Sequence, residues 1–293
     1  MPESIDPTTP SDAAFTRRVF VGMGAGSAAL VSNPGLAALA EDQGFGKPHP
    51  PIVAENDPEI VVTREALEHG GRRLDAYAAL PKREPVGSVV VILHIWGIDA
   101  NIRDIVRRFA KEGYVTIAPD LFAGLGAPDG DNTTDYAPFR EVASKLSRET
   151  VDADIRAAAD WARTPPPVLR LPTRTLRVAI TGFCMGGAIA LRQTVGNAAG
   201  FSAASIWYGA VKDVDPTKVR VPILGSYGGR DTGIPADEVR TFYAALPVPH
   251  DLKVYDEAGH AFFDDTRPSY VASAASDAWP RTLGWFRRYL SAS

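Results

Sequence analysis

Three residues whose types cooperate in nucleophilic catalysis each follow a separate apolar run of the chain. Cys184 is the only cysteine among the 293 residues, and Asp231 and His260 lie further toward the C-terminus. If each apolar run is a strand of one parallel sheet, all three side chains lie at the carboxyl edge of that sheet, where they can meet. A thiol beside an imidazole that is oriented by a carboxylate predicts covalent catalysis by an activated cysteine.

The residues around Cys184 read Gly182-Phe183-Cys184-Met185-Gly186-Gly187. A nucleophile at a sharp strand-to-helix turn needs small neighbours, and the glycines meet that need. Read separately, each candidate has a structural alternative. Cys184 fits a small buried hydrophobe, Asp231 a helix cap, and His260 a histidine in a surface loop. The joint occurrence, in the order nucleophile, acid, histidine, favours a catalytic triad.

The rest of the chain predicts how these residues are positioned. Alternating residues at 59–63 and 73–79 indicate an antiparallel hairpin, and the continuously apolar run at 88–94 indicates a buried parallel strand. Strands and helices then alternate, which predicts a single α/β domain over residues 59–293 with a mostly parallel, doubly wound sheet and helices on both faces. One or two helices are expected within residues 141–161. Pro280 marks either a kink or the start of the last helix.

Composition excludes several function classes. The net charge of −4 and the absence of long runs of like charge argue against nucleic-acid binding. A single cysteine excludes an intrachain disulfide and any multi-cysteine metal site, and the five histidines show no metal-binding spacing. We therefore expect no cofactor and no metal, and a small molecule as the partner.

The N-terminal residues carry a different signal. Arg17 and Arg18 precede a weakly apolar run that ends in Ala38-Leu39-Ala40, as in a twin-arginine export signal over residues 1–40. Proline and glycine interrupt that run, which argues against a permanent membrane span. The alternative is a disordered extension with a chance arginine pair. The signal predicts contact with the twin-arginine export machinery and a periplasmic or secreted enzyme, whereas without it the protein is cytoplasmic. Residues 41–58 indicate a proline-rich linker or surface arm.

Over residues 59–290 the chain resembles the dienelactone hydrolase family of the α/β-hydrolase superfamily. The resemblance rests on the motif around Cys184 and on the segments at residues 95–104, 113–121 and 258–262. It implies that Cys184 attacks an ester or lactone carbonyl, that His260 transfers the proton and that Asp231 orients His260. It also implies an oxyanion hole formed by the backbone N–H groups of Met185 and Ile95.

The sequence departs from the family pattern at three positions. His94 stands where relatives commonly carry a glutamate beside the nucleophile. It fits a second base, an ion-pair partner of the Cys184 thiolate, or a residue that only fills space. Gly124 and Asp264 stand where the dienelactone enzymes use arginines to bind the carboxylate of their substrate. An aspartate repels a carboxylate, so we expect a neutral ester or lactone.

Further residues near these motifs are candidates for substrate binding. Arg230 and Arg267 are candidates to replace the missing arginines, although surface ion pairs are the more common role of such residues. Trp96 and Phe262 adjoin the proposed catalytic segments and are candidates for an apolar substrate pocket. The alternatives to a neutral-substrate hydrolase are an exported binding protein on an inactive hydrolase scaffold and a dienelactone hydrolase with relocated carboxylate-binding residues.

Overall fold

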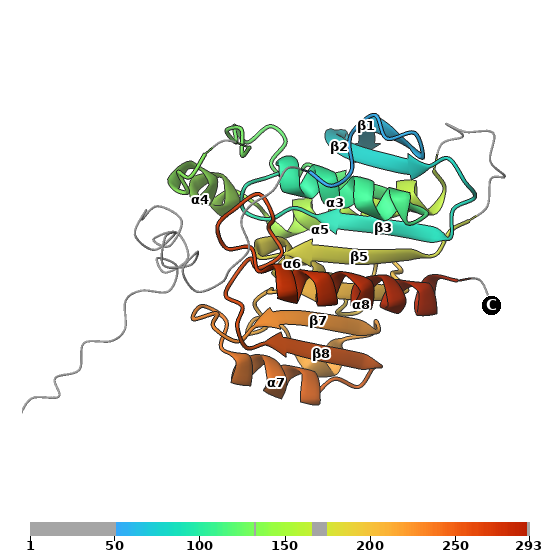
Figure 1. The fold of residues 1–293 in the computed structure, drawn as a ribbon. Coiled ribbons are helices and arrows are strands. Elements are labelled where there is room, and N and C mark those ends of the chain that lie inside the picture. Colours follow the sequence, from blue (N-terminus) through green and yellow to red (C-terminus); the bar gives the residue numbers. More distant parts are fainter. Residues whose placement is uncertain (1–50, 132, 166–174, 292–293) are drawn as a thin grey trace, which may run out of the picture.

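The computed structural model describes residues 51–131, 133–165 and 175–291 (Figure 1). The export signal expected at residues 1–40 and the first part of the expected linker lie outside these residues. Eight strands form one sheet in the order β1-β2-β4-β3-β5-β6-β7-β8. The strands are β1 (Ile60–His69), β2 (Arg72–Pro81), β3 (Gly87–Ile92), β4 (Tyr114–Pro119), β5 (Val178–Phe183), β6 (Ala203–Trp207), β7 (Ile223–Gly228) and β8 (His250–Tyr255).

The expected hairpin and the expected parallel sheet are both present. β1 pairs with β2, and β2 with β4, in antiparallel fashion, whereas every pair from β4 to β8 is parallel. All residues of β3, β4, β5, β6 and β7 are buried, as expected for strands that helices cover on both faces. The prediction of a single α/β domain with a mostly parallel sheet is confirmed.

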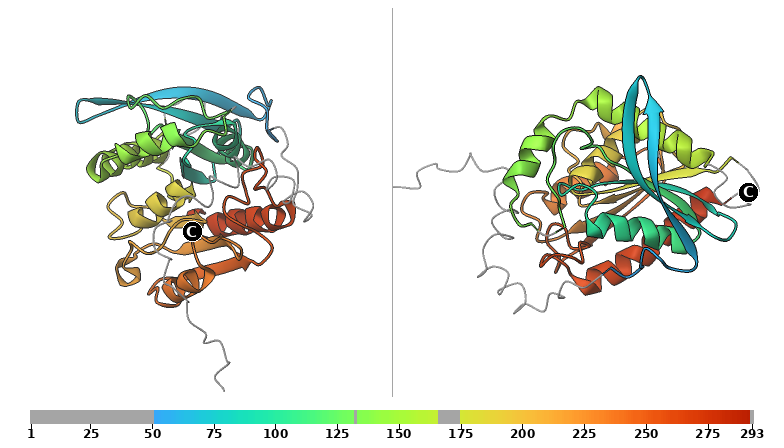
Figure 2. Two further views of the ribbon diagram at one scale, coloured as in Figure 1. Left: turned by 90° about the vertical axis from the view of Figure 1, so that its left-hand side faces the viewer. Right: turned by 90° about the horizontal axis from the view of Figure 1, so that it is seen from above.

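Helices cover both faces of this sheet (Figures 1 and 2). On one face α3 packs against α8, where the Phe109 ring lies 4.5 Å from Trp279 and 5.8 Å from Phe286. On the other face α5 and α6 are joined by a hydrogen bond of 2.5 Å from Gln193 to Asp152. The α-helices are α3 (Ala100–Lys111), α4 (Ala137–Ser144), α5 (Arg148–Arg163), α6 (Met185–Gln193), α7 (Ala236–Ala244) and α8 (Ala272–Leu290), and a short 3₁₀ helix spans Pro216–Lys218.

The structure resolves two questions that the sequence left open. Residues 141–161 belong to two helices, because α4 ends at Ser144 and the Ser147 side chain caps α5 by accepting a hydrogen bond from the Thr150 N–H. Pro280 lies inside α8, which begins eight residues earlier at Ala272, so it does not start the helix.

The end of the expected linker is attached to the domain. The N–H groups of Ile52 and Val53 donate to the Asp104 carboxylate at 3.0 and 2.8 Å, and Arg107 donates to the carbonyl of Val53. This segment therefore packs on α3, and the folded domain begins earlier than residue 59. Within the described part of the chain, no helix has the length and apolar character needed to cross a membrane.

The sheet brings the predicted site residues to one edge. In the register of the parallel strands Ile92 pairs with Gly182, Gly182 with Ile206, and Gly228 with Tyr255. The carboxyl ends of β3, β5, β6, β7 and β8 therefore lie side by side, and the segments that follow them carry the candidate residues.

Candidate active site

Cys184 occupies a strained corner between β5 and α6. It has φ 56° and ψ −117°, and it is the N-cap residue of α6. A positive φ is costly for any residue with a Cβ, and such strain persists only where the surroundings enforce it. Here the Cys184 N–H donates to the carbonyl of Trp207 at 3.1 Å, which attaches the corner to the end of β6. The predicted sharp turn from strand to helix at Cys184 is present, and the role of Cys184 as nucleophile stays a prediction.

The neighbouring glycines are required by close backbone approach. A Cβ on Gly182 would overlap the carbonyl oxygen of Gly186, and a Cβ on Gly186 would overlap the carbonyl oxygen of Leu93. A Cβ on Gly187 would lie 2.6 Å from the carbonyl oxygen of Trp207. The start of α6 therefore fits between the ends of β3 and β6 only because these three positions have no side chain.

Asp231 and His260 form a hydrogen-bonded pair at the ends of β7 and β8. Oδ2 of Asp231 lies 2.6 Å from Nδ1 of His260. The other oxygen, Oδ1, accepts from the N–H groups of Gly233 at 2.9 Å and Ile234 at 3.1 Å, which fixes the carboxylate. Asp231 does not cap α7, whose N-cap residue is Pro235. The Asp231 carboxylate therefore stabilises the turn at residues 231–234 and also orients the His260 imidazole.

Cys184 and His260 form a coupled pair of charges. Burial would raise the pKa of the Cys184 thiol, but the charge of His260, its hydrogen bond to the thiol and the charge of His94 outweigh burial and lower this pKa. Burial would lower the pKa of His260, whereas the Cys184 charge and the Asp231 hydrogen bond raise it to about 10. Both shifts favour the thiolate and imidazolium forms of this pair, and the thiolate is the reactive form of cysteine. The His260 side chain remains 19% exposed, so solvent reaches the pair.

The segments that carry the two predicted oxyanion donors both adjoin the start of α6. The N–H of Met185, at the start of α6, hydrogen-bonds to the Cys184 sulfur. Ile95 lies in a turn closed by a hydrogen bond of 3.1 Å from the Gly97 N–H to the His94 carbonyl. This turn directly follows Leu93, which contacts the start of α6 at Gly186. The oxyanion hole stays a prediction that this placement supports.

A buried charged cluster surrounds His94. Nδ1 of His94 accepts from the Trp96 N–H at 3.2 Å, and Nε2 lies 3.3 Å from Oδ1 of Asp99 and 3.8 Å from Oδ2 of Asp264. Arg267 faces both carboxylates, with Nε 3.3 Å from Oδ2 of Asp264 and Nη2 3.5 Å from Oδ2 of Asp99. The expectation that Arg267 makes a surface ion pair is wrong, because its side chain is only 8% exposed. We call His94, Asp99, Asp264 and Arg267 the His94 cluster.

The contacts of His94 decide between its possible roles. Its Nδ1 is occupied by the Trp96 N–H, and its Nε2 faces the carboxylates of Asp99 and Asp264. Neither ring nitrogen is directed to Cys184, which argues against a second base. The charge of His94 nevertheless lowers the pKa of the Cys184 thiol.

The protonation of His94 depends on two opposing effects. Burial would lower its pKa, but the Asp99 and Asp264 carboxylates outweigh burial and raise it. The Trp96 N–H opposes a proton on Nδ1, and such a neutral hydrogen bond contributes about 1 kcal/mol. Without the added proton, two buried carboxylates would face one guanidinium, and an unbalanced buried charge costs about 3–5 kcal/mol. The balance favours the protonated ring.

Three residues of the His94 cluster have side chains of the kind that bind metal ions. His94, Asp99 and Asp264 each place a ligand atom within 4.8 Å of the others. The Arg267 guanidinium already pairs with both carboxylates, and a fixed cation at that distance repels a divalent ion. The residues present therefore do not fit a resident metal.

Aromatic residues line the surroundings of Cys184, but not all of those expected. Trp96 is 8% exposed and stacks its ring 3.9 Å from the Arg267 guanidinium, and Tyr136 lies 5.7 Å from Trp96. Burial raises the pKa of Tyr136, and so does the charge of Cys184, which places Tyr136 near the nucleophile. Phe262 is fully buried and packs on Trp207, so it is a core residue and not a pocket wall.

Sequence reasoning missed Tyr208, Tyr136 and Asp99. Tyr208 directly follows β6 and lies edge-on to the His260 ring at 5.3 Å. Its position one residue past a buried strand was a usable signal. Asp99 is the N-cap residue of α3 and accepts a hydrogen bond from the Ile102 N–H. A helix cap is a common role for aspartate, so the sequence does not predict its contact with His94. Tyr136 lies in the loop before α4, and no sequence pattern indicated that it lies near Cys184.

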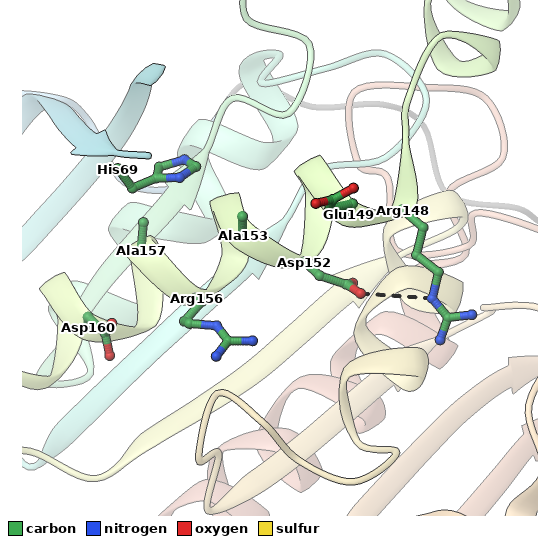
Figure 3. A pocket seen from close by; sticks show the side chains of 8 residues that line it. All are labelled: His69, Arg148, Glu149, Asp152, Ala153, Arg156, Ala157 and Asp160. Carbon is green, nitrogen blue, oxygen red and sulfur yellow. Dashed lines mark ion pairs between the residues drawn. The ribbon is translucent and has the colours of Figure 1, made fainter. Parts of the chain in front are cut away.

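A separate surface groove lies along α5 (Figure 3). It is lined by His69, Arg148, Glu149, Asp152, Ala153, Arg156, Ala157 and Asp160. Arg148 and Asp152 form an ion pair of 3.8 Å within it, and charges of both signs alternate along its length. It includes no residue of the triad or of the His94 cluster.

Comparisons with known proteins identify the family of this chain. The sequence profile described as "Dienelactone hydrolase family" matches residues 74–290. This chain belongs to the dienelactone hydrolase family. A protein of Escherichia coli K12, provisionally named a carboxymethylenebutenolidase, is 36% identical over 276 residues, covering 86% of this chain and 97% of the relative. A Yersinia pestis relative with the same name is 37% identical over 239 residues, covering 75% of this chain and 85% of the relative.

Solved structures of dienelactone hydrolase type share the fold. A structure from Klebsiella pneumoniae, provisionally titled a dienelactone hydrolase, has a TM-score of 0.69 and 35% identity, and the match covers 78% of this chain and 99% of that one. The dienelactone hydrolase-like phosphotriesterase P91 has a TM-score of 0.65 at 20% identity, covering 80% of this chain and 100% of that chain, and shows the fold alone. As a member of the dienelactone hydrolase family, the protein is a lactone or ester hydrolase.

Proposed function

We propose that the protein hydrolyses a neutral ester or lactone through a thioester on Cys184. The observation that carries this proposal is the convergence of the Cys184 sulfur, the His260 imidazole and the Asp231 carboxylate at one edge of the sheet. The His260–Asp231 hydrogen bond measures 2.6 Å, and His260 also hydrogen-bonds to the Cys184 sulfur. The alternative of an inactive binding scaffold needs an ordinary thiol, whereas these contacts lower the pKa of Cys184.

The reaction follows from these positions. The Cys184 thiolate attacks the carbonyl carbon, and the resulting oxyanion is stabilised by the N–H groups of Met185 and Ile95. Collapse breaks the carbon–oxygen bond, and His260 donates its proton to the departing alkoxide. In the thioester the charge of Cys184 is gone, so the pKa of His260 falls, because that charge is the first of the causes that raise it. The neutral imidazole then takes a proton from water, which attacks the thioester and releases the acid and the thiolate.

The substrate preference follows from the charges beside the nucleophile. Asp264 is buried in the His94 cluster, and Gly124 offers no charge. Arg267 is engaged with Asp99 and Asp264, and its Nη1 and Nη2 donate to the carbonyls of Thr133 at 3.0 Å and Gly130 at 2.9 Å. A carboxylate on the substrate therefore gains no partner from these three positions, so a neutral acyl group binds better.

A matched pair of substrates tests this preference. We expect kcat/KM for the methyl ester of a butenolide carboxylic acid to exceed that for the free carboxylate by about tenfold or more, since the free carboxylate loses its water and gains no free cationic partner at these positions. The measurement is hydrolysis of the lactone ring in both compounds, with Cys184→Ala as the blank. A preference for the carboxylate would support instead a dienelactone hydrolase with relocated carboxylate-binding residues.

Export by the twin-arginine route is part of the same proposal and is supported by Arg17, Arg18 and Ala38-Leu39-Ala40. Replacing Arg17 and Arg18 together by lysine is expected to retain the unprocessed chain in the cytoplasm of a bacterial host. Cell fractionation and N-terminal sequencing of the mature protein measure this, and lysines at Arg287 and Arg288 are the control. Unchanged export of the Arg17/Arg18 variant would contradict the signal.

A further inference from the structure

The His94 cluster places two carboxylates and a guanidinium around an imidazole that no step of the proposed reaction uses. The side chains of His94, Asp99, Asp264 and Arg267 are 5%, 1%, 3% and 8% exposed. We propose that Asp99 and Asp264 are positioning residues that hold an extra proton on His94, and that this buried imidazolium stabilises the thiolate of Cys184. The inference rests on the proposed function only in taking Cys184 as the nucleophile.

The charges that face His94 come from three segments of the chain. Asp99 precedes α3, Asp264 and Arg267 follow β8, and Cys184 precedes α6. Asp99 is fixed by accepting from the Ile102 N–H at 3.1 Å, and Asp264 by accepting from the Thr266 hydroxyl at 2.7 Å. Both carboxylates are therefore held in place independently of His94, as positioning groups must be.

The charge balance of the His94 cluster favours the proton. With a neutral ring and both carboxyl groups ionised, Asp99 and Asp264 carry two negative charges against the single positive charge of Arg267. Burial and the charge of Asp99 raise the pKa of Asp264, whereas the charge of His94 lowers it, so an imidazolium at His94 favours the ionised form of this carboxyl group. These groups are almost fully desolvated, so water does not compensate the excess. An imidazolium at His94 makes the cluster neutral. The added charge therefore lies on a ring whose Nε2 faces the two carboxylates.

The proton at His94 acts on Cys184 through space. No hydrogen bond joins the two residues among those that the structure shows, whereas the charge of His94 favours the thiolate. His260 supplies the hydrogen bond and the mobile proton, and His94 supplies a fixed charge. A fixed charge remains in place when His260 gives its proton to the leaving group.

Asp264→Asn in the full-length protein tests the proposal. Asparagine keeps an oxygen for Thr266 but removes the charge, so Arg267 alone balances Asp99 and His94 no longer needs its proton. We expect the ¹⁵N resonances of His94 to show an imidazolium in the wild type at pH 7 and a neutral ring in the variant. We also expect the pH midpoint of Cys184 alkylation by iodoacetamide to rise by about one unit, a tenfold slower reaction on the acid limb.

Asp265→Asn is the matched control. Asp265 is a neighbouring buried aspartate whose ion pair is with Arg108, so a purely structural loss should affect both variants alike. We expect the Asp265 variant to keep the wild-type alkylation profile. Equal shifts in both variants, or no shift in the Asp264 variant, would overturn the proposal. If either variant fails to fold, the ¹⁵N resonances of wild-type His94 still test the proposal. A neutral ring at pH 7 would overturn the proposal by itself.

The same experiment separates this inference from the proposed function. Alkylation and ring resonances are measured without any ester, so they report on His94 even if no substrate is hydrolysed. An unshifted alkylation profile in an active hydrolase would overturn the inference alone. Stoichiometric zinc in the wild type, absent from Asp264→Asn, would show that a metal occupies the His94 cluster in place of the added proton. That result would also overturn the inference.

Discussion

Replacing Cys184 with alanine is expected to abolish burst acylation by an activated ester and to lower turnover by on the order of 10⁴-fold or more. The reason is that the attacking sulfur and its pairing with His260 are both lost, while the remaining backbone donors supply only the residual catalysis of an oxyanion hole. Stopped-flow release of nitrophenolate measures the burst and the steady state together. An unchanged burst in the alanine variant would exclude Cys184 as the nucleophile.

The pH dependence of the wild type is the companion measurement. The pKa of the Cys184 thiol is lowered, so alkylation by iodoacetamide should reach half its maximum well below the value of about 8.5 for a free thiol. The sign follows from the thiolate being reactive: the rate rises as pH passes upward through the lowered pKa. A midpoint near the free-thiol value would favour the inactive binding scaffold.

Replacing Gly186 with alanine is expected to destabilise the fold by about 3 kcal/mol or more. The added methyl group would overlap the carbonyl oxygen of Leu93 and lie 2.5 Å from that of Ile92, and backbone atoms at the centre of a sheet cannot move aside cheaply. Any folded fraction should also lose activity, because α6 would be displaced from β3 and Cys184 from the oxyanion donors. Urea denaturation and ester hydrolysis measure the two effects.

Gly284→Ala is the control for this substitution. Gly284 lies on the exposed side of α8, and a Cβ there meets nothing within 4 Å. Alanine in an exposed helix position is favoured over glycine by about 1 kcal/mol, so this variant should be slightly more stable than the wild type. Equal stability of the two variants would contradict the close approach of α6 and β3.

The amino-acid sequence by itself determined the order of the elements and the common sheet edge of Cys184, Asp231 and His260. The buried parallel strands have near-continuous apolar runs because helices cover both faces, and this pattern is visible without a structure. Cys184, Asp231 and His260 each follow such a run, so the common edge of a parallel sheet predicts that they meet. The glycines around Cys184 predicted the sharp turn, because close backbone approach leaves no room for a Cβ.

The tertiary structure alone decided the surroundings of the triad. Asp99 and Asp264 are 165 residues apart, and only the packing of the loop after β8 against the start of α3 brings both to His94. The same packing buries Arg267, which sequence reasoning placed at the surface, and it places Phe262 in the core. Periodicity reports which face of an element is apolar, but side-chain contacts between distant loops depend on three-dimensional packing. The proposed catalytic pair of Cys184 and His260 could therefore be predicted from the sequence, whereas the charged residues that surround it could not.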